Sequence, residues 1–349
     1  MSSHDTGLRV VHSETPVKEI WSRLSYFESK HNAREFIKKF SLPNNNLTDV
    51  ASSLAFTMKT AREYYESAQR VSLLTQPLLI FYGMTALSKV LFISTYGKKS
   101  PSKSHGLSPP RPELFAKIST RIRRDGTFPQ FHSCYSKEKL YRMKFTMKEL
   151  LSSAPEVKIE YETIYNEKSR ALKVLRTRYG INVVDTEIEK YGDLSTNLKK
   201  VFPEINTIQV FEKRLVIFSR LSNRQIRAVS GEKYLLLPLK KHNRNVFLPE
   251  MSAHFLIMYL LGMISRYHPK EWGETIKGEE SGEVYIIQKF LKITTRKFPN
   301  LILNELWDRD FVFTSPKVET EAEKRLDGEQ LEKIYDYVNR RLANEIRGY

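Results

Sequence analysis

The fold of this 349-residue chain is decided by residues 64–93, which read YYESAQRVSLLTQPLLIFYGMTALSKVLFI. The second half of this stretch is apolar on most sides, and a helix of that kind is buried in a core or in a membrane. Side chains that recur every three or four positions lie on one helical face. That face consists of Leu79, Tyr82, Gly83, Ala86, Val90 and Ile93. We predict a central helix with four of these residues buried in the main core, namely Leu79, Tyr82, Ala86 and Val90.

A membrane helix is the weaker alternative for this stretch. Gln76 and Pro77 stand at its front and Lys89 near its back. The uninterrupted apolar run is therefore shorter than the roughly 20 residues that a membrane span needs. Pro77 suits the first turn of a helix, where its missing N–H costs nothing. We expect a buried helix and no membrane association.

Several short motifs occur in one order along the chain. They are Tyr64-Tyr65, Gln76-Pro77, Tyr82-Gly83-Met84, His105-Gly106, the run Phe145–Leu151, the run Ser265–Pro269, Trp272-Gly273, Phe298-Pro299 and Asn304-Glu305-Leu306. In these motifs the chain resembles the YaaC-like family of bacterial proteins, and the resemblance covers most of the chain except about 156–250. It implies a cytoplasmic prokaryotic protein and no established activity.

Composition indicates a globular protein. The chain is 40% hydrophobic and 11% aromatic, which is too apolar for a disordered chain. Cys134 is its only cysteine, so no internal disulfide and no multi-cysteine zinc site can form. The start, MSSHDTGLRVVHSE, lacks the basic-then-apolar pattern of a secretory signal. We expect a cytoplasmic location.

The chain divides into three regions, which together predict an α+β fold. Residues 1–155 are expected to be an N-terminal helical region that contains the core helices of Tyr64–Ile93. An exposed, irregular loop over 97–112, rich in Ser, Pro, Lys and Gly, interrupts it. Residues 156–250 are expected to be mixed α/β, and residues 251–349 helical. The predicted fold is thus predominantly helical, with a small mixed or antiparallel β region in the middle of the chain.

Local patterns place several elements in the second and third regions. A helix is expected over Glu160–Arg178, and strands over Arg214–Arg220 and Tyr234–Leu239, where apolar and β-branched runs are bounded by polar turns. Ser252 is expected to cap a helix that runs through Tyr267 and is stopped by a following proline.

The chain carries 57 lysine and arginine residues against 40 acidic residues, a net charge of +17. Such an excess favours polyanionic partners through counterion release. The candidate nucleic-acid contacts are Arg121, Arg123 and Arg124, before a predicted turn, and Lys240, Lys241 and Arg244, in a predicted hairpin loop between Tyr234–Leu239 and Asn245–Leu248. Aromatic side chains near the arginines could stack on bases, but core positions are the stronger prediction for Phe128, Phe131 and Tyr135.

No complete catalytic, metal or phosphate-binding motif is present. The patterns H-E-x-x-H, G-x-x-x-x-G-K-[ST], G-x-G-x-x-G and G-x-S-x-G do not occur. The tyrosine-rich stretch is loosely similar to the core helix of the HEPN ribonucleases, but their R-x(4–6)-H motif is missing. We predict no metal site and no cofactor.

Five polar residues are candidates for a shared ligand pocket: Gln76, Tyr82, His105, Arg266 and Glu305. His105 lies in a loop beside a glycine and titrates near neutral pH. Arg266 ends an apolar helix and could pair with Glu305, although a cation there also complements the helix dipole. Gln76 and Tyr82 should be hydrogen-bonded when buried. Structural roles are the alternative for each of these residues.

Three hypotheses about function remain open. The first is a non-enzymatic nucleic-acid-binding or accessory subunit of a prokaryotic system, such as phage defence. The second is a nuclease or nucleotide-processing enzyme whose site contains residues such as His105, Arg266 and Glu305. The third is a scaffold or regulator that binds another protein through an amphipathic C-terminal helix. The apolar stripe of that predicted helix consists of Leu331, Ile334, Tyr335, Val338, Leu342 and Ile346.

Overall fold

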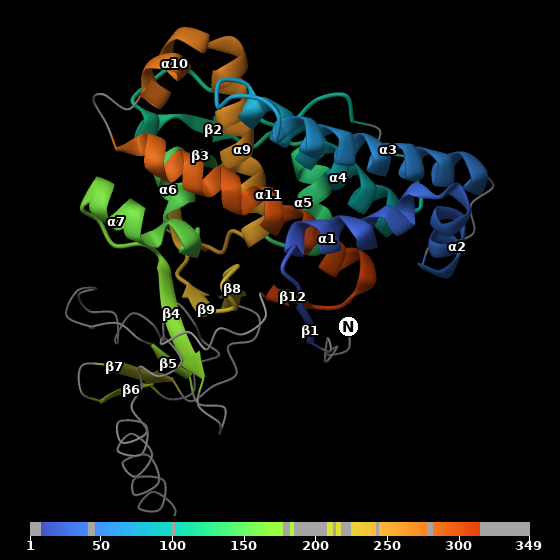
Figure 1. Ribbon diagram of the computed structural model, residues 1–349. Helices are drawn as coiled ribbons and strands as arrows, with labels where there is room; N and C mark the ends of the chain where they lie inside the picture. The colour runs from blue at the N-terminus through green and yellow to red at the C-terminus, as the bar shows by residue number, and fades with distance from the viewer. Residues whose placement is uncertain are drawn as a thin grey trace, which may run out of the picture.

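The computed structural model describes residues 8–40, 46–99, 102–176, 182–184, 208–211, 214–217, 225–241, 244–277 and 282–314. Most of them form a helical body (Figure 1). Its helices are α1 (Pro16–Leu24), α2 (Lys30–Phe40), α3 (Leu47–Ala68), α4 (Gln76–Tyr96), α5 (Thr127–Tyr135), α6 (Met147–Leu151), α7 (Lys158–Tyr165), α9 (Glu250–Tyr267), α10 (Pro269–Lys277) and α11 (Glu283–Trp307). Short 3-10 helices lie at η1 (Ser25–Glu28), η2 (Phe115–Lys117) and η3 (Pro155–Val157).

Helix α4 is the central helix that the sequence predicts. It packs against α3, α5, α9 and α11 (Figure 1). Ala86 and Val90 are buried, as predicted, but Leu79 and Tyr82 are only half-buried. That part of the prediction is wrong because these two side chains lie on the outer side of the first turns of α4, whereas Ile80 and Phe81 in the same turns are buried. Among the described residues, α4 is the one helix long and apolar enough to cross a membrane, and 72% of its apolar window is buried inside the protein.

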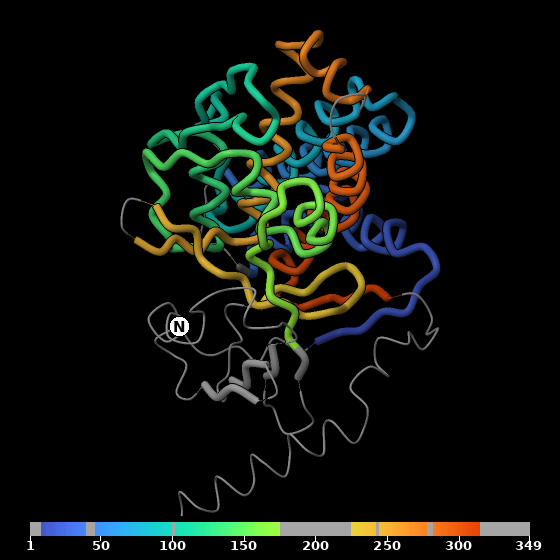
Figure 2. Tube along the Cα trace, turned by 90° about the vertical axis from the view of Figure 1, so that its left-hand side faces the viewer, coloured from blue at the N-terminus to red at the C-terminus, as the bar shows by residue number. Residues whose placement is uncertain are grey.

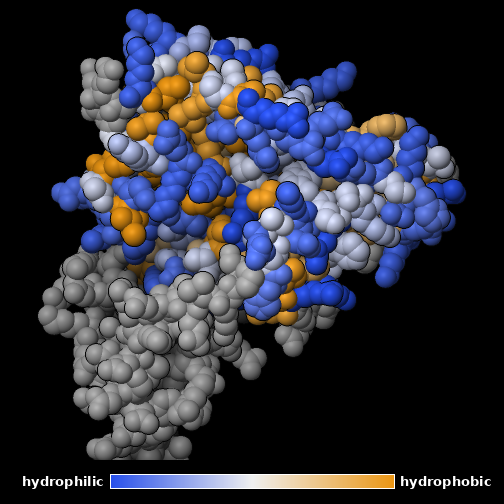
Figure 3. Space-filling view, in the orientation of Figure 1, coloured by the Kyte–Doolittle hydropathy of each residue, from blue (hydrophilic) through white to orange (hydrophobic). Residues whose placement is uncertain are grey.

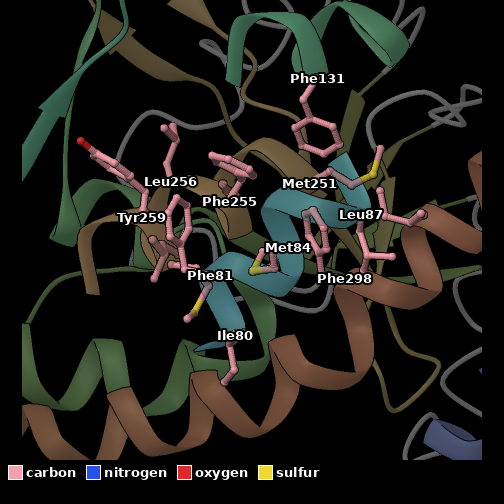
Figure 4. Packing of buried hydrophobic residues seen from close by; sticks show 14 of the residues in the cluster. Ile80, Phe81, Met84, Leu87, Phe131, Met251, Phe255, Leu256, Tyr259 and Phe298 are labelled. Carbon is pink, nitrogen blue, oxygen red and sulfur yellow. The ribbon is translucent and has the colours of Figure 1, made fainter. Parts of the chain in front are cut away.

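Aromatic side chains join the central helices. Phe81 on α4 meets Phe255 on α9, with ring centroids 5.5 Å apart. Phe131 on α5 lies 5.5 Å from Phe255 and 5.7 Å from Phe298 on α11. Figure 4 shows these rings pointing toward one another around Met84. The core therefore combines residues from the first and third regions of the chain, and the three-region division remains a prediction.

The β-strands form small sheets, so the fold is α+β and predominantly helical, as predicted. The largest sheet has the order β6-β7-β5-β4-β9-β8 and is antiparallel throughout. Its strands are β4 (Ala171–Arg176), β5 (Asn182–Val184), β6 (Ile208–Phe211), β7 (Arg214–Ile217), β8 (Gln225–Arg227) and β9 (Lys233–Leu236). The predicted strand over Arg214–Arg220 matches β7 in its described part.

Three strand pairs complete the β structure of the described residues. They are β2 (Ser119–Arg121) with β3 (Lys144–Thr146), β10 (Leu239–Lys241) with β11 (Arg244–Val246), and β1 (Arg9–His12) with β12 (Phe311–Thr314). The first two pairs are antiparallel, and β1–β12 is parallel. Figure 2 shows β1 and β12 side by side at the base of the helical body.

The helix predicted over Glu160–Arg178 is present only as far as Tyr165, and the prediction is wrong for the described residues beyond it. Helix α7 ends at Tyr165, where Asn166 adopts a left-handed conformation with φ of 48°. The chain then forms β4, which pairs with β5 and β9. Its apolar residues were assigned to a helix because a local pattern does not reveal which strands lie beside it.

Other boundaries also differ from the predictions. Ser252 is not the cap of α9, because the helix begins at Glu250, after Pro249. The predicted end of this helix at Tyr267 is confirmed. The predicted strand over Tyr234–Leu239 is divided between β9 and β10. The predicted hairpin is present as β10–β11. The predicted C-terminal helix lies outside the described residues.

The loop over 97–112 contains no helix or strand in its described part, as predicted. It is not exposed throughout, because Gly106 and Leu107 are buried and Leu107 forms an isolated bridge with Ile122.

On the face in Figure 3, hydrophilic side chains cover most of the end where α2 and α3 lie, and apolar side chains gather on the opposite side.

Candidate functional site

Arg266 and Tyr82 meet at one end of the helical body. Arg266 lies in the last turn of α9, where the helix dipole favours a cation. Its Nη1 donates a hydrogen bond to the Tyr82 hydroxyl on α4. Its guanidinium also lies over the Tyr267 ring, 4.9 Å from the centroid. Arg266 therefore pairs with Tyr82 and not with Glu305, and both Arg266 and Tyr267 remain exposed.

A second tyrosine extends this contact. Tyr64 on α3 stacks on Tyr82, with centroids 5.7 Å apart and planes inclined by 29°. The close approach of α3 and α4 requires Gly83, since a Cβ there would lie 2.6 Å from the Tyr65 ring and 3.3 Å from the Tyr64 Cβ. Gly83 thus allows the tyrosine stack to form.

His105 lies beside the same contact. Its ring packs 5.1 Å from the Phe81 ring and 5.7 Å from the Tyr259 ring. Burial lowers the pKa of His105, and the nearby cations Lys89 and Arg266 lower it further. His105 and Arg266 are thus close enough to interact electrostatically, and the lowered pKa favours the neutral form of the ring.

The arginine cluster predicted from the sequence adjoins the His105 loop. The backbone N–H of Arg123 donates to the Gly106 carbonyl at 2.9 Å. A Cβ on Gly126 would lie only 2.1 Å from the Gly106 Cα, so the two loops touch backbone to backbone. Arg121, Arg123 and Arg124 are exposed and form no ion pair with any described residue. Two predicted groups of site residues are therefore neighbours.

These contacts define one surface, which we call the Arg–Tyr face: Tyr64, Tyr82, His105, Arg123, Arg266 and Tyr267. The sequence did not single out Tyr64 or Tyr267 as functional, although both lie in the family-like motifs. The aromatics it considered near the arginines are instead core residues, since Phe128 and Phe131 are fully buried and Tyr135 is half-buried.

The second predicted basic cluster is largely occupied by internal contacts. Lys241 on β10 lies 2.5 Å from Glu149 and over the Phe145 ring. Arg244 on β11 is 3.4 Å from Glu138 and also donates to the carbonyl of Lys139. Lys240 is exposed. Only part of this cluster's charge is therefore available to a partner.

Two of the five predicted pocket residues lie apart from the Arg–Tyr face. Gln76 donates from Nε2 to the Ala68 carbonyl at 3.0 Å, which ties the start of α4 to the end of α3. Glu305 on α11 lines a cavity of about 470 Å³, which none of the other four candidates lines. Desolvation raises the pKa of Glu305 to about 7, with a further rise from Asp308, although the residue is exposed by its accessible surface.

Sequence reasoning missed a buried charged cluster near this cavity. The Lys297 ammonium lies 2.5 Å from carboxylate oxygens of both Glu156 and Glu250. His254 lies nearby and shares a 2.8 Å hydrogen bond between its Nδ1 and the Thr294 hydroxyl. Burial lowers the pKa of His254 to about 3, and Lys297 adds to the effect. These residues come from η3, α9 and α11, so no local motif could reveal them.

The described residues offer neither a metal-binding cluster nor an activated cysteine. No group of three or more His, Cys, Asp or Glu side chains could hold a metal ion in this part of the chain. Burial raises the pKa of Cys134 to about 12, so its thiol is not a nucleophile at neutral pH.

Four motifs of the sequence meet at the Arg–Tyr face, through Tyr64, Tyr82, His105 and Arg266. A family model described as "YaaC-like Protein" matches residues 25–306. The chain belongs to the YaaC-like protein family. The match includes α3, α4, α9 and α11, the helices that build this face and the core beneath it. No curated protein and no solved structure matches the chain.

Proposed function

We propose that this YaaC-like protein is a non-enzymatic nucleic-acid-binding subunit whose Arg–Tyr face holds a single strand. The observation that carries the proposal is Arg266, an exposed cation held between Tyr82 and Tyr267. Non-sequence-specific single-strand sites combine cations for the phosphates with aromatic rings on which bases stack. Tyr267 is 58% exposed and so offers its ring to a base.

Charge supports the same proposal. Arg123 and Arg266 lie on this face, and neither forms an ion pair within the described residues. A bound phosphate would therefore not have to displace a carboxylate from either of them. The net charge of +17 adds long-range attraction for a polyanion. A subunit that binds in this way would position nucleic acid for other components of a prokaryotic system, such as a phage-defence complex.

The test is a fluorescence-anisotropy titration with labelled single- and double-stranded DNA and RNA, between low and physiological salt. We expect single strands to bind more tightly than duplexes, with affinity that falls steeply as salt rises. The double variant Arg123→Ala/Arg266→Ala should weaken binding for all sequences. It should also flatten the salt slope by roughly one unit for each lost phosphate contact.

A charge-matched control is available on α2. Arg34→Ala/Lys38→Ala removes the same charge from exposed positions on another part of the molecule. This control should bind nearly as well as the unmutated protein. If the unmutated protein binds none of the four nucleic acids at low salt, or if both double variants weaken binding equally, the proposal is wrong.

A further inference from the structure

The cavity that Glu305 lines lies between the helical body and the large sheet. Its walls come from the end of α5 and the residues after it, from β8 and β9, from the start of α9 and from α11. A volume of about 470 Å³ is within the range of small-molecule sites, which runs from roughly 300 to 1,000 Å³. Apolar side chains such as Phe247, Met251 and Leu301 line it together with three glutamates.

The buried cluster behind this cavity has more negative than positive groups. Lys297 is the one cation between the carboxylates of Glu156 and Glu250, and its own side chain is only 5% exposed. His254 does not supply a second positive charge, because burial keeps it neutral. With both glutamates ionised, Glu156, Glu250 and Lys297 together carry a charge of −1, and the further cation Arg296 interacts with this cluster through Glu156.

Contact geometry assigns this excess to Glu250. Lys297 lies 2.5 Å from an oxygen of each carboxylate, so the difference between the two glutamates comes from their other contacts. Glu156 also accepts a hydrogen bond from the Val229 backbone N–H at 3.1 Å. Burial by itself would raise the pKa of Glu156, but the attraction of Lys297 is larger and the pKa of Glu156 is lowered. For Glu250 the effect of burial exceeds that of Lys297, and its pKa rises to about 7.

Glu250 also faces the cavity. Its side chain is nine-tenths buried, at 10% exposure, yet it contributes to the cavity wall. No described residue donates a hydrogen bond to its second oxygen, Oε2, and this oxygen is not fully buried. A cationic group in the cavity could therefore donate a hydrogen bond to it.

The other two glutamates of the cavity, Glu305 and Glu138, differ in whether a cation lies beside them. Glu305 forms no ion pair with any described residue. Glu138 is already compensated by Arg244, 3.4 Å away. Lys137 also lies at the wall; like Glu305 it is exposed, and it forms no ion pair with a described residue. Glu305 is therefore unpaired within the described residues, and Glu250 shares the single cation Lys297 with Glu156.

We propose that this cavity binds a small aliphatic amine, with ammonium groups held by Glu250 and Glu305 and the carbon chain lying along Phe247, Met251 and Leu301. A carboxylate or phosphate ligand would be repelled by the same two glutamates. A metal ion lacks a sufficient ligand set among the described residues. An organic ammonium needs no fixed coordination geometry, and its apolar chain matches the rest of the wall.

The experiment is isothermal titration calorimetry of the full chain with 1,6-diaminohexane near neutral pH. We expect saturable binding of one molecule per chain. The neutral analogue 1,6-hexanediol should not bind, because it has the same chain without the charges. Glu305→Gln and Glu250→Gln should each weaken diamine binding by about tenfold or more, the effect of losing roughly 1.4 kcal/mol.

The matched control is Glu271→Gln, which neutralises an exposed glutamate on α10. It should leave diamine binding unchanged. Glu305→Gln remains informative even if Glu250→Gln does not fold, because Glu305 is partly exposed and lies outside the buried cluster. The proposal is overturned if the unmutated protein does not bind the diamine, if the diol binds equally well, or if Glu305→Gln binds as tightly as Glu271→Gln.

Discussion

The Tyr82 hydroxyl accepts a hydrogen bond from Arg266, although the two residues are 184 positions apart in the chain. The contact joins the first helical region to the last at the surface of the molecule. It also explains why Tyr82, which lies on an apolar helix, is only half-buried. An arginine that donates from one terminal nitrogen to a tyrosine keeps its remaining N–H groups available to a phosphate.

Arg266→Lys should separate the charge of this residue from its planar shape. Lysine keeps the positive charge but cannot form the flat, forked contacts of a guanidinium. We expect Arg266→Lys to bind nucleic acid more weakly with an unchanged salt slope. Arg266→Ala should lower both the affinity and the salt slope. Anisotropy titrations at several salt concentrations measure the two quantities separately. Equal salt slopes for the alanine and lysine variants would show that Arg266 does not contact phosphate.

Tyr267→Leu should affect single strands more than duplexes. The substitution removes an exposed ring that can stack on an unpaired base and keeps the charge of Arg266, which loses its contact with this ring but retains Tyr82. Such stacking contributes about 1–3 kcal/mol per base, so affinity for a single strand should fall by about fivefold or more. Tyr285→Leu, at another exposed tyrosine on α11, is the matched control. A similar loss for duplex and single strand would argue against stacking.

Leu87→Ala and Leu79→Ala should differ in their effects on stability. Leu87 is fully buried on α4, so its truncation should lower the free energy of unfolding by about 2–5 kcal/mol. Leu79 is half-buried, so its truncation should cost clearly less. Urea melts with unchanged m-values give both numbers. A larger loss for Leu79→Ala would contradict the packing of α4 described above.

Gly126→Ala should disturb the loop that positions His105. The added Cβ would collide with the Gly106 backbone, and the φ of 142° at Gly126 is unfavourable for alanine. We expect a loss of about 1–3 kcal/mol or more in stability, together with weaker nucleic-acid binding and a shifted His105 NMR resonance. Gly273→Ala is the control, since a Cβ there meets nothing within 4 Å. An unchanged His105 resonance would show that the Gly126 contact does not position the ring.

Glu250→Gln tests the raised pKa of Glu250, which burial lifts from 4.5 to about 7. Between these values the folded protein keeps a proton that the unfolded chain has released. The contribution of Glu250 to stability is therefore fully present below pH 4.5 and is lost as the pH rises through 7. The glutamine variant does not titrate.

The unfolding free energy of the unmutated protein minus that of Glu250→Gln should thus fall between pH 4.5 and pH 7. The upper limit is about 3 kcal/mol, since each pKa unit corresponds to roughly 1.4 kcal/mol. Urea melts of both proteins over this pH range measure the difference, and the titration of His254 largely cancels because both proteins contain it. A difference that rises with pH would contradict the assignment.

Local sequence patterns were sufficient for the central helix and for the fold class. The apolar residues of α4, with Pro77 in its first turn, predict a buried helix because they depend only on positions close in the chain. The same reasoning failed for β4, which is a strand because β5 and β9 pair with it. Pairing between distant segments leaves no signal in a short window of sequence.

The candidate site was predictable in part. Arg123, His105 and Arg266 were singled out, and they lie close together in the structure. Their assembly depends on the contact between Gly106 and Gly126 and on the crossing of α4 and α9, which the sequence does not show. The cluster around Lys297 was missed because a lysine within an apolar helix has no local sign of its distant carboxylate partners.

The parallel pairing of β1 with β12 determines how the protein responds to a pulling force. Arg9 lies opposite Phe311 and His12 opposite Thr314, so the chain enters this pair at one end and leaves it at the other. A force applied through the two flanking segments therefore shears the strands along their length and loads all of their hydrogen bonds at once. Antiparallel strands in that place would be peeled apart one bond at a time.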